Sequence, residues 1–310
     1  MNNTKNYFED LVGQYAVKKK LSFYIDAFNK TSQAPFLLMA GAKGLGKTEF
    51  AQNFAANLHN ANGEKRAFLE INCSTIKNNT AFFEQLGSTI VNNDITILFD
   101  ECHALPKDLT MAFLTIFNSD TSHTKSFTWE DSTFNFNFKR QTFIFATTET
   151  DKIFPPLKDR LTTIDFEPYS TNELGQIIEL CAPDITITDE CLEVIASTIR
   201  CNARSAVKRS KEIMLYCKSR DVDVFGLKHF EDLSDHVGIL PYGLTHTEKQ
   251  ILLALQDCRS ATLTGLAAKI GMSKTALQRD HELYLLNRSL IEIDGKRKIT
   301  NHGLEICKSL

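Results

Sequence analysis

Short apolar runs alternate with segments of helical periodicity in the first half of the chain. The runs, each long enough for one strand, are at 36–40, 67–72, 96–99, 142–147 and 163–166. The segments with apolar residues at helical spacing are at 17–29, 47–59, 80–91 and 109–118. Strands that alternate with helices are typical of a parallel sheet covered on both faces. The pattern therefore predicts an α/β core over residues 1–167.

The strand pattern fades after this core. Between residues 171 and 235 apolar residues recur at three- and four-residue spacing, which is typical of amphipathic helices. One such face carries Leu174, Ile177 and Ile178, and another carries Leu192, Ile195 and Ile199. We predict a small helical domain over residues 168–240.

The C-terminal segment has a third pattern. Pro241-Tyr242-Gly243 is typical of a linker, and helical periodicity follows at 247–256, 263–270 and 274–287, where Ser273 can cap the last helix. Strand-like stretches at 289–293 and 298–300 flank Asp294-Gly295, a strong signal for a tight hairpin. Three helices followed by a hairpin predict a winged helix-turn-helix over residues 241–310.

Composition limits the class of protein. The chain has 310 residues, of which 43% are hydrophobic and 24% charged, so it is globular in composition. It has no apolar run of membrane-spanning length and no apolar N-terminal signal segment, so we expect no membrane partner. Eight scattered cysteines without a C-x-x-C pair favour neither a zinc site nor a redox motif and fit the cytoplasm. Residues 241–310 carry ten Lys or Arg against seven Asp or Glu, which is compatible with nucleic acid.

The most specific motif lies between the first strand and the next helix. Residues 41–48 read Gly-Ala-Lys-Gly-Leu-Gly-Lys-Thr and match the phosphate-loop pattern G-x-x-x-x-G-K-[ST] at every fixed position. Backbone N–H groups of such a loop converge on phosphates, and the helix N-terminus adds its positive dipole end. The residues expected to hold ATP are Gly41, Gly44, Leu45, Gly46, Lys47 and Thr48.

Two acids follow the apolar run at 95–99. Asp100, with the hydroxyl of Thr48, is expected to hold Mg²⁺ beside the phosphate loop. Glu101 can polarise the attacking water as a general base. Acids at this distance from a phosphate loop favour an ATPase. The neighbouring Cys102 and His103 complete no nucleophile–base pair, so we assign them no catalytic role.

The order of these motifs resembles that of the RuvB-like AAA+ ATPases, the family of Holliday-junction branch-migration motors. The resemblance covers roughly residues 8–305 and rests on the segments 8–14, 41–48, 100–105, 146–148, 156–160 and 203–206, together with the C-terminal winged helix. It implies an AAA+ core, a helical lid domain and a winged-helix domain. It also implies ATP and Mg²⁺ as cofactors and a ring of subunits, as a hexamer, on double-stranded or junction DNA.

The resemblance also implies roles for single residues. Val12, Gly13 and Gln14 should lie near the adenine, and Thr148 matches the residue that positions water near the γ-phosphate. Arg160 matches the arginine finger, which acts on ATP bound by the neighbouring subunit. Arg204 matches the lid arginine that senses the γ-phosphate. For each of three residues a role without catalytic function stays open: a surface charge for Arg160, a solvated helix face for Arg204 and the end of a strand for Thr148.

The chain departs from the family pattern at several positions. Ala42 and Lys43 stand where the family loop usually has prolines, and Lys158 replaces an arginine. Leu161 replaces a phenylalanine, and residues 201–204 replace the lid sequence G-T-P-R. These changes indicate a distant relative. They weaken the transfer of substrate identity more than that of ATP hydrolysis.

Residues 119–140 are expected to form a protruding β-hairpin, because residues 133–139 alternate strictly between polar and apolar. The resemblance implies that this hairpin docks a junction-binding protein. Trp129 and Phe136 either belong to that partner surface or pack within the protein, and the sequence leaves both readings open.

Two groups in the winged helix are expected to contact DNA. Lys274, Gln278 and Arg279 share one helical face, and the cations Lys296, Arg297 and Lys298 lie on the tight turn at the wing tip. Backbone phosphate contacts of this kind position a duplex without reading its sequence. A winged helix used only for protein contacts is the alternative.

Taken together, the residues and the resemblance predict an ATP-driven motor on double-stranded DNA. Two alternatives stay open. One is a clamp-loader, helicase-loader or replication-initiation switch, and the other is a DNA-binding regulator with an AAA+ assembly core.

Overall fold

The computed structural model describes residues 6–118 and 123–310, and its contacts divide the chain into two compact units. The first unit is Met1–Glu173 together with Asn202–Arg204, and the second is Leu174–Cys201 with Ser205–Leu310. Over the described residues, no helix combines the length and the apolar character that crossing a membrane requires. The helical and winged segments fall into one unit, so the division into three domains stays a prediction.

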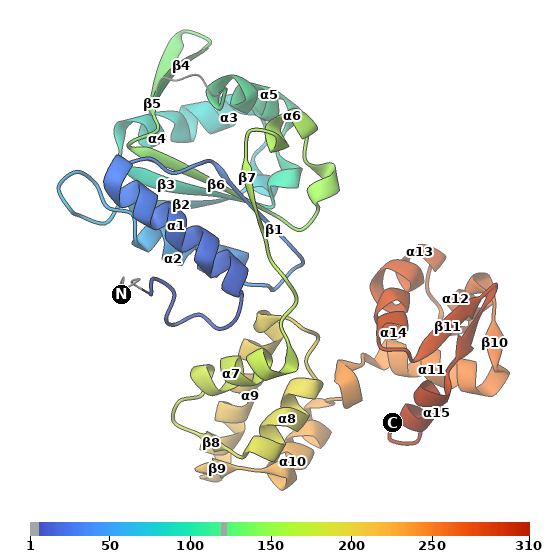
Figure 1. The fold of residues 1–310 in the computed structure, drawn as a ribbon. Coiled ribbons are helices and arrows are strands. Elements are labelled where there is room, and N and C mark those ends of the chain that lie inside the picture. Colours follow the sequence, from blue (N-terminus) through green and yellow to red (C-terminus); the bar gives the residue numbers. More distant parts are fainter. Residues whose placement is uncertain (1–5, 119–122) are drawn as a thin grey trace. The chain divides into compact units, whose positions relative to one another are not determined.

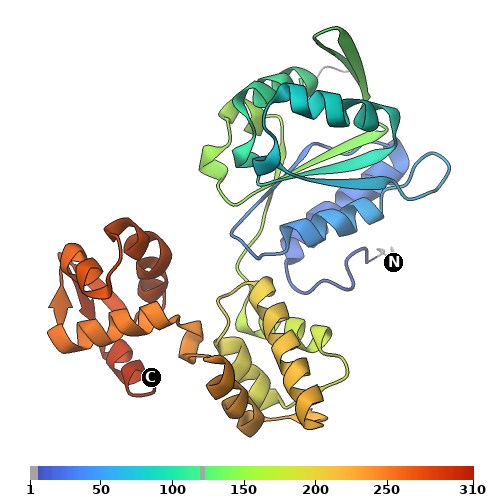
Figure 2. The ribbon, with the colours of Figure 1, turned by 180° about the vertical axis from the view of Figure 1, so that it is seen from behind.

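A five-stranded parallel sheet forms the centre of the first unit. Its order is β2-β3-β6-β1-β7, with the bounds β1 Leu37–Ala40, β2 Ala67–Asn72, β3 Ile95–Asp100, β6 Gln141–Thr147 and β7 Thr162–Asp165. Helices α1 (Tyr15–Thr31) and α2 (Lys47–Ala56) cover one face, and α5 (Lys107–Ile116) lies over the other (Figures 1 and 2). Every residue of β1 and β6 is buried, as expected for central parallel strands. The predicted α/β core is confirmed.

The helix predicted over residues 80–91 is interrupted in the structure. It consists of α3 (Asn79–Phe82), a π-helical turn at Phe83–Gly87 and α4 (Ser88–Asn92). The turn lies where the ring of Phe134 packs on Gly87, so closely that a Cβ at this glycine would come within 2.4 Å of the ring. Hydrophobic periodicity alone does not distinguish this turn from a regular helix.

The predicted hairpin is present and comprises β4 (Thr124–Trp129) and β5 (Ser132–Asn137), while residues 119–122 lie outside the described residues. Its aromatic side chains share one face, which packs against the protein's own core around Phe83. Phe136 is only 2% exposed, so the reading of Phe136 as a partner contact is wrong. Trp129 is half-buried with its ring 5.9 Å from that of Phe83. Strand alternation explains the result, because it leaves polar side chains on the outer face.

Four helices dominate the first part of the second unit: α7 (Thr171–Cys181), α8 (Asp189–Ser197), α9 (Ala203–Arg220) and α10 (Leu227–Val237). The short parallel strands β8 (Thr186–Ile187) and β9 (Val224–Phe225) pair between them and were not predicted. Two-residue strands carry too little periodicity to be recognised. The expected linker forms a 3-10 turn at Pro241–Gly243.

The C-terminal segment has the arrangement of a winged helix-turn-helix. Helices α11 (His246–Cys258) and α12 (Leu263–Ile270) precede a third helix made of α13 (Lys274–Leu277), a π-helical turn at Gln278–Glu282 and α14 (Leu283–Asn287). The strands β10 (Ser260–Ala261), β11 (Ile291–Asp294) and β12 (Lys296–Ile299) form a sheet of order β10-β12-β11. Ser273 caps the third helix as predicted. A final helix, α15 (Asn301–Cys307), was not predicted.

Candidate nucleotide site and C-terminal surface

The phosphate loop joins β1 to α2, as its sequence context predicts. Gly44 and Gly46 have φ angles of 82° and 91°, a region that favours glycine, and Gly46 directly precedes the helix. The Lys47 ammonium donates to the carbonyl oxygens of Gly41 (2.8 Å) and Ala42 (3.0 Å). Burial lowers the pKa of Lys47, while the carboxylates of Glu101 and Asp100 act in the opposite direction. The loop thus holds a cation among its own backbone groups, where a phosphate would bind.

The segment Asn202–Arg204 lies against this loop. The Ala203 N–H donates to the Gly44 carbonyl oxygen (2.9 Å), and the Asn202 side chain is so close that a Cβ on Gly44 would come within 2.9 Å of it. The charge of Arg204 acts on Lys47. Arg204 is therefore near the expected phosphate position. This placement favours the sensing role over a merely solvated helix face, and the role stays a prediction.

Asp100 is the last residue of β3 and Glu101 follows it, and β6 runs between β3 and β1. The Glu101 N–H donates to the carboxylate of Asp100 (3.0 Å), and Glu101 has a left-handed backbone with φ of 51°. The Thr148 hydroxyl, one residue beyond β6, donates to Oε2 of Glu101 (3.2 Å). The structure therefore brings Glu101 and Thr148 together, as a water-activating pair requires. Asp100 and Thr48 offer the oxygen ligands that Mg²⁺ prefers, so the residues fit this ion.

Residues 12–14 are tied to the chain beyond β7. The Gln14 amide donates to the Glu167 carbonyl oxygen (2.6 Å) and accepts from the Glu167 N–H (3.2 Å). The Tyr169 hydroxyl donates to the carbonyl oxygen of Leu45, within the phosphate loop (3.2 Å). These contacts hold Val12, Gly13 and Gln14 in the first unit together with the loop. Their role near the adenine stays a prediction.

Arg160 follows the short helix α6 (Pro155–Lys158). Its guanidinium donates to the carbonyl oxygen of Pro156. Its Nε atom is buried, and among the described residues it has no hydrogen-bond partner. A buried donor without a partner is costly, so the environment of this arginine is incomplete in the single chain. The role of an arginine finger toward a neighbouring subunit is consistent with this and stays a prediction.

The two residues after Glu101 differ in their surroundings. Burial raises the pKa of the Cys102 thiol to about 12, so it is a thiol and not a nucleophilic thiolate. The His103 ring contacts the hydroxyl of Thr147 and the carboxylates of Glu101 and Glu149. Two of these partners, Thr147 and Glu149, are distant along the chain, so the contacts of His103 cannot be recognised from sequence.

The three cations after the wing turn are separated by strand alternation. We expected Lys296, Arg297 and Lys298 at the turn, but all three lie within β12, so Arg297 faces the opposite side from its two neighbours. The Arg297 guanidinium is 11% exposed and binds Glu282 through contacts of 2.7 and 3.2 Å. Lys298 pairs with Asp294 (2.9 Å). Arg297 is therefore held in an internal ion pair and no longer fits the phosphate-binding set.

The third helix of the winged segment is also less regular than expected. Lys274, Gln278 and Arg279 are exposed, but the latter two belong to the π-helical turn. The wider turn changes the spacing that would place all three on one face of an α-helix. The Arg279 guanidinium binds the carboxylate of Asp280 (2.6 and 2.9 Å). Their contact with DNA stays a prediction.

A phosphate loop after a central strand, with an acidic pair at the end of a second strand, defines a P-loop ATPase. Residues 4–165 match the sequence profile described as the Holliday junction DNA helicase RuvB P-loop domain. This match covers more than half of the chain, and the protein belongs to that family.

Similar proteins extend over most of the chain. The Holliday junction branch migration complex subunit RuvB of Thermotoga petrophila is 25% identical over 297 residues, which cover 91% of this chain and 85% of the relative. The subunit of the same name in Mycoplasmopsis pulmonis is 24% identical over 312 residues, which cover 98% of this chain and 96% of the relative. Among solved structures, the Thermotoga maritima RuvB Holliday junction branch migration motor matches with a TM-score of 0.75 at 22% identity, over 98% of both chains. That structure shares the fold.

Proposed function

We propose that this protein is an ATP-driven motor that moves double-stranded DNA during branch migration of Holliday junctions. The observation that carries the proposal is the convergence around the phosphate loop. Glu101 is held by Thr148, and the segment at 202–204 contacts the loop. Motifs that are distant in sequence meet in one site, which suits a cycle of ATP hydrolysis and not only nucleotide binding.

In this proposal ATP binds the phosphate loop, with its adenine near Val12, Gly13 and Gln14. Thr48 and Asp100 would hold Mg²⁺, which would supply positive charge against the charge that develops on the phosphates. Glu101 polarises the attacking water, and Thr148 keeps its carboxylate in place. Arg160 acts on ATP bound by the neighbouring subunit of a ring, and Arg204 responds to the γ-phosphate.

DNA contact is proposed for Lys274, Gln278, Arg279, Lys296 and Lys298. Such residues contact phosphates, so binding should be independent of DNA sequence and sensitive to salt. A junction-binding protein is the proposed partner of the hairpin β4–β5, through the polar outer face that includes Ser126 and Asn135.

The first experiment is native mass spectrometry with a non-hydrolysable ATP analogue and a plain DNA duplex. A six-subunit assembly that forms on the duplex is expected. Branch migration of a synthetic four-way junction is then measured with ATP, with Glu101→Gln as the matched variant that binds ATP and does not hydrolyse it. A monomer or incomplete ring that is indifferent to DNA would contradict the motor and favour a loader or switch.

A further inference from the structure

His103 lies between two carboxylates beside the nucleotide site. Its Nδ1 atom is 3.0 Å from the Thr147 hydroxyl and 3.4 Å from Oε2 of Glu101. Its Nε2 atom is 3.1 Å from Oε2 of Glu149. The His103 side chain is 19% exposed, against 34% for Glu101 and 39% for Glu149. The ring therefore forms a bridge from the water-activating glutamate to a second acid across the end of β6.

The bridge meets Glu101 at the oxygen that Thr148 also contacts. Thr148 donates to Oε2 of Glu101, and the imidazole lies against the same atom. Contacts on one oxygen fix the plane of a carboxylate and hence the direction of its other oxygen. Glu101 also stands on left-handed backbone, which restricts the choice of side-chain directions. Its orientation thus depends on a hydroxyl and an imidazole.

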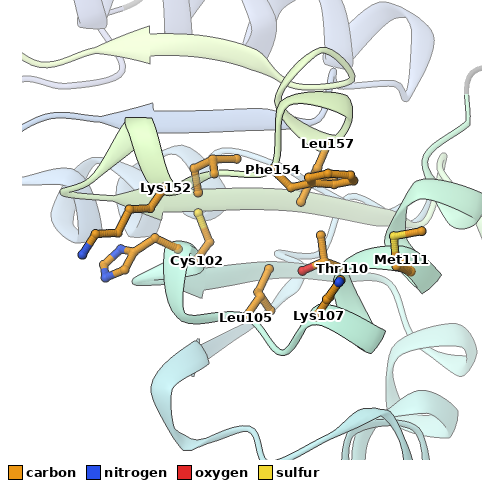
Figure 3. Close-up of a pocket in the computed structure, with 10 residues that line it drawn as sticks. Cys102, Leu105, Lys107, Thr110, Met111, Lys152, Phe154 and Leu157 are labelled. Carbon is orange, nitrogen blue, oxygen red and sulfur yellow. The ribbon is translucent and has the colours of Figure 1, made fainter.

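The position of the His103 ring depends on its polar contacts, because packing around it is incomplete. The ring lines a cavity of about 230 Å³ together with Cys102, Met111, Phe154 and other side chains. Figure 3 shows side chains from the turn after β3, from α5 and from the α6 region around this space. A side chain beside a void lacks contact partners on that side. The contacts with Thr147 and Glu149 therefore decide where the imidazole lies.

We propose that His103 is a positioning residue for ATP hydrolysis, anchored by Glu149 and acting on Glu101. This rests on the proposed role of Glu101 as the group that polarises water. The ring lies against Glu149 through Nε2, and through Nδ1 it lies against the Thr147 hydroxyl and Glu101. The ring then works with Thr148 to keep the Glu101 carboxylate in the direction that water activation needs. Glu149 acts only through the ring.

Steady-state ATP hydrolysis by the full chain, with DNA present, tests whether His103 positions Glu101. His103→Ala is expected to lower kcat about ten-fold, the size of one lost orienting hydrogen bond, with KM for ATP changed by less than about two-fold. Glu149→Gln should lower kcat about three-fold. It should cause no further loss of kcat in the His103→Ala background, because Glu149 acts through the imidazole that this variant lacks. Lys107→Ala, which alters the rim of the same cavity, is the control and should leave kcat unchanged.

An NMR measurement tests the contact without any turnover. The long-range ¹H–¹⁵N spectrum of the imidazoles reports on both ring nitrogens of His103, which is assigned by its loss in His103→Gln. Glu149→Gln should shift the Nε2 signal. An Nε2 signal that is unchanged in Glu149→Gln, an unchanged kcat in His103→Ala, or additive losses in the double variant would overturn the proposal. Failure of junction movement by a wild type that hydrolyses ATP would instead overturn the motor and leave this test intact.

Discussion

The nucleotide site and the C-terminal winged segment use charged side chains in different ways. Around the phosphate loop, Lys47 is held by backbone carbonyls and Glu101 by a hydroxyl and an imidazole. In the C-terminal unit, Arg297 is bound to Glu282, and Arg200 is bound to the fully buried Glu248. Ion pairs that are built into a fold leave fewer charges for a ligand. The spacing of charged residues in the sequence therefore predicts their contact with a ligand only where the local backbone sets the direction of the side chain.

The internal pairs of the C-terminal unit are strong constraints on its structure. Glu248 accepts from the Thr245 N–H (2.8 Å), binds Arg200, and lies 3.2 Å from Nδ1 of His281. Arg200 also donates to the Gly243 carbonyl oxygen (2.8 Å) and lies 4.0 Å above the Tyr284 ring. A buried pair gives little net stability, but breaking it leaves a charge without compensation. Arg200 therefore ties α11 to the linker turn.

The largest expected effect tests the nucleotide side of this comparison. Arg160→Ala should lower the rate of ATP hydrolysis by about 10³–10⁵, the range known for arginine fingers. Mixing Arg160→Ala with Glu101→Gln should restore part of the activity, because mixed rings contain sites with an intact loop and a neighbour's intact arginine. Lys158→Ala, at the end of the short helix that precedes Arg160, is the control. Absence of recovery in stable mixed rings would contradict action between subunits.

The next largest effect is expected in the reactivity of the Cys102 thiol, which lies beside the acidic pair. The pKa of Cys102 is raised to about 12 by burial, so its thiolate fraction near pH 8 should be about 10³ lower than that of an ordinary thiol. Iodoacetamide labelling followed by peptide mass spectrometry should modify the exposed Cys258 rapidly and Cys102 very slowly. Comparable rates for the two cysteines in the folded protein would contradict the buried placement of Cys102.

Breaking an internal pair should cost the C-terminal unit much of its stability. Arg200→Ala leaves the buried Glu248 without its cation, and we expect a loss of about 3–5 kcal/mol in the free energy of local unfolding. Hydrogen exchange of α11 peptides measures this loss directly. Lys208→Ala removes a highly exposed partner of Glu212 and should change exchange by less than about 1 kcal/mol. Equal protection of α11 in both variants would refute the role of the pair.

The sequence predicted the architecture well because long periodic segments and the phosphate loop are local signals. All five strands of the parallel sheet lie where apolar runs predict them, and Ser273 caps the helix that it was expected to cap. The loop fixes Lys47 through its own glycines, so its direction follows from eight consecutive residues. Thr148 meets Glu101 because the ends of parallel strands meet at one edge of the sheet.

The failures of prediction share a physical cause. The sequence left Phe136 open between a partner contact and internal packing, and the structure buries it, because a hairpin with one apolar face buries that face whenever a core is available. Arg297 was grouped with its neighbours, although alternate residues of a strand point to opposite faces. His103 was dismissed because its partners, Thr147 and Glu149, are more than forty residues away. Each error depended on a partner that only the fold brings close.

The smallest effect is expected for the charged residues of the C-terminal wing. Lys296→Ala should reduce the slope of log binding constant against log salt concentration by about 1 for duplex DNA, the value for one lost phosphate contact. The double variant Arg297→Met with Glu282→Leu removes the internal pair as a unit, which proteins tolerate better than loss of one partner. It should leave the salt slope unchanged, because the Arg297 charge is already neutralised by Glu282. A salt slope that falls equally in Lys296→Ala and in the double variant would show that Arg297 contacts DNA.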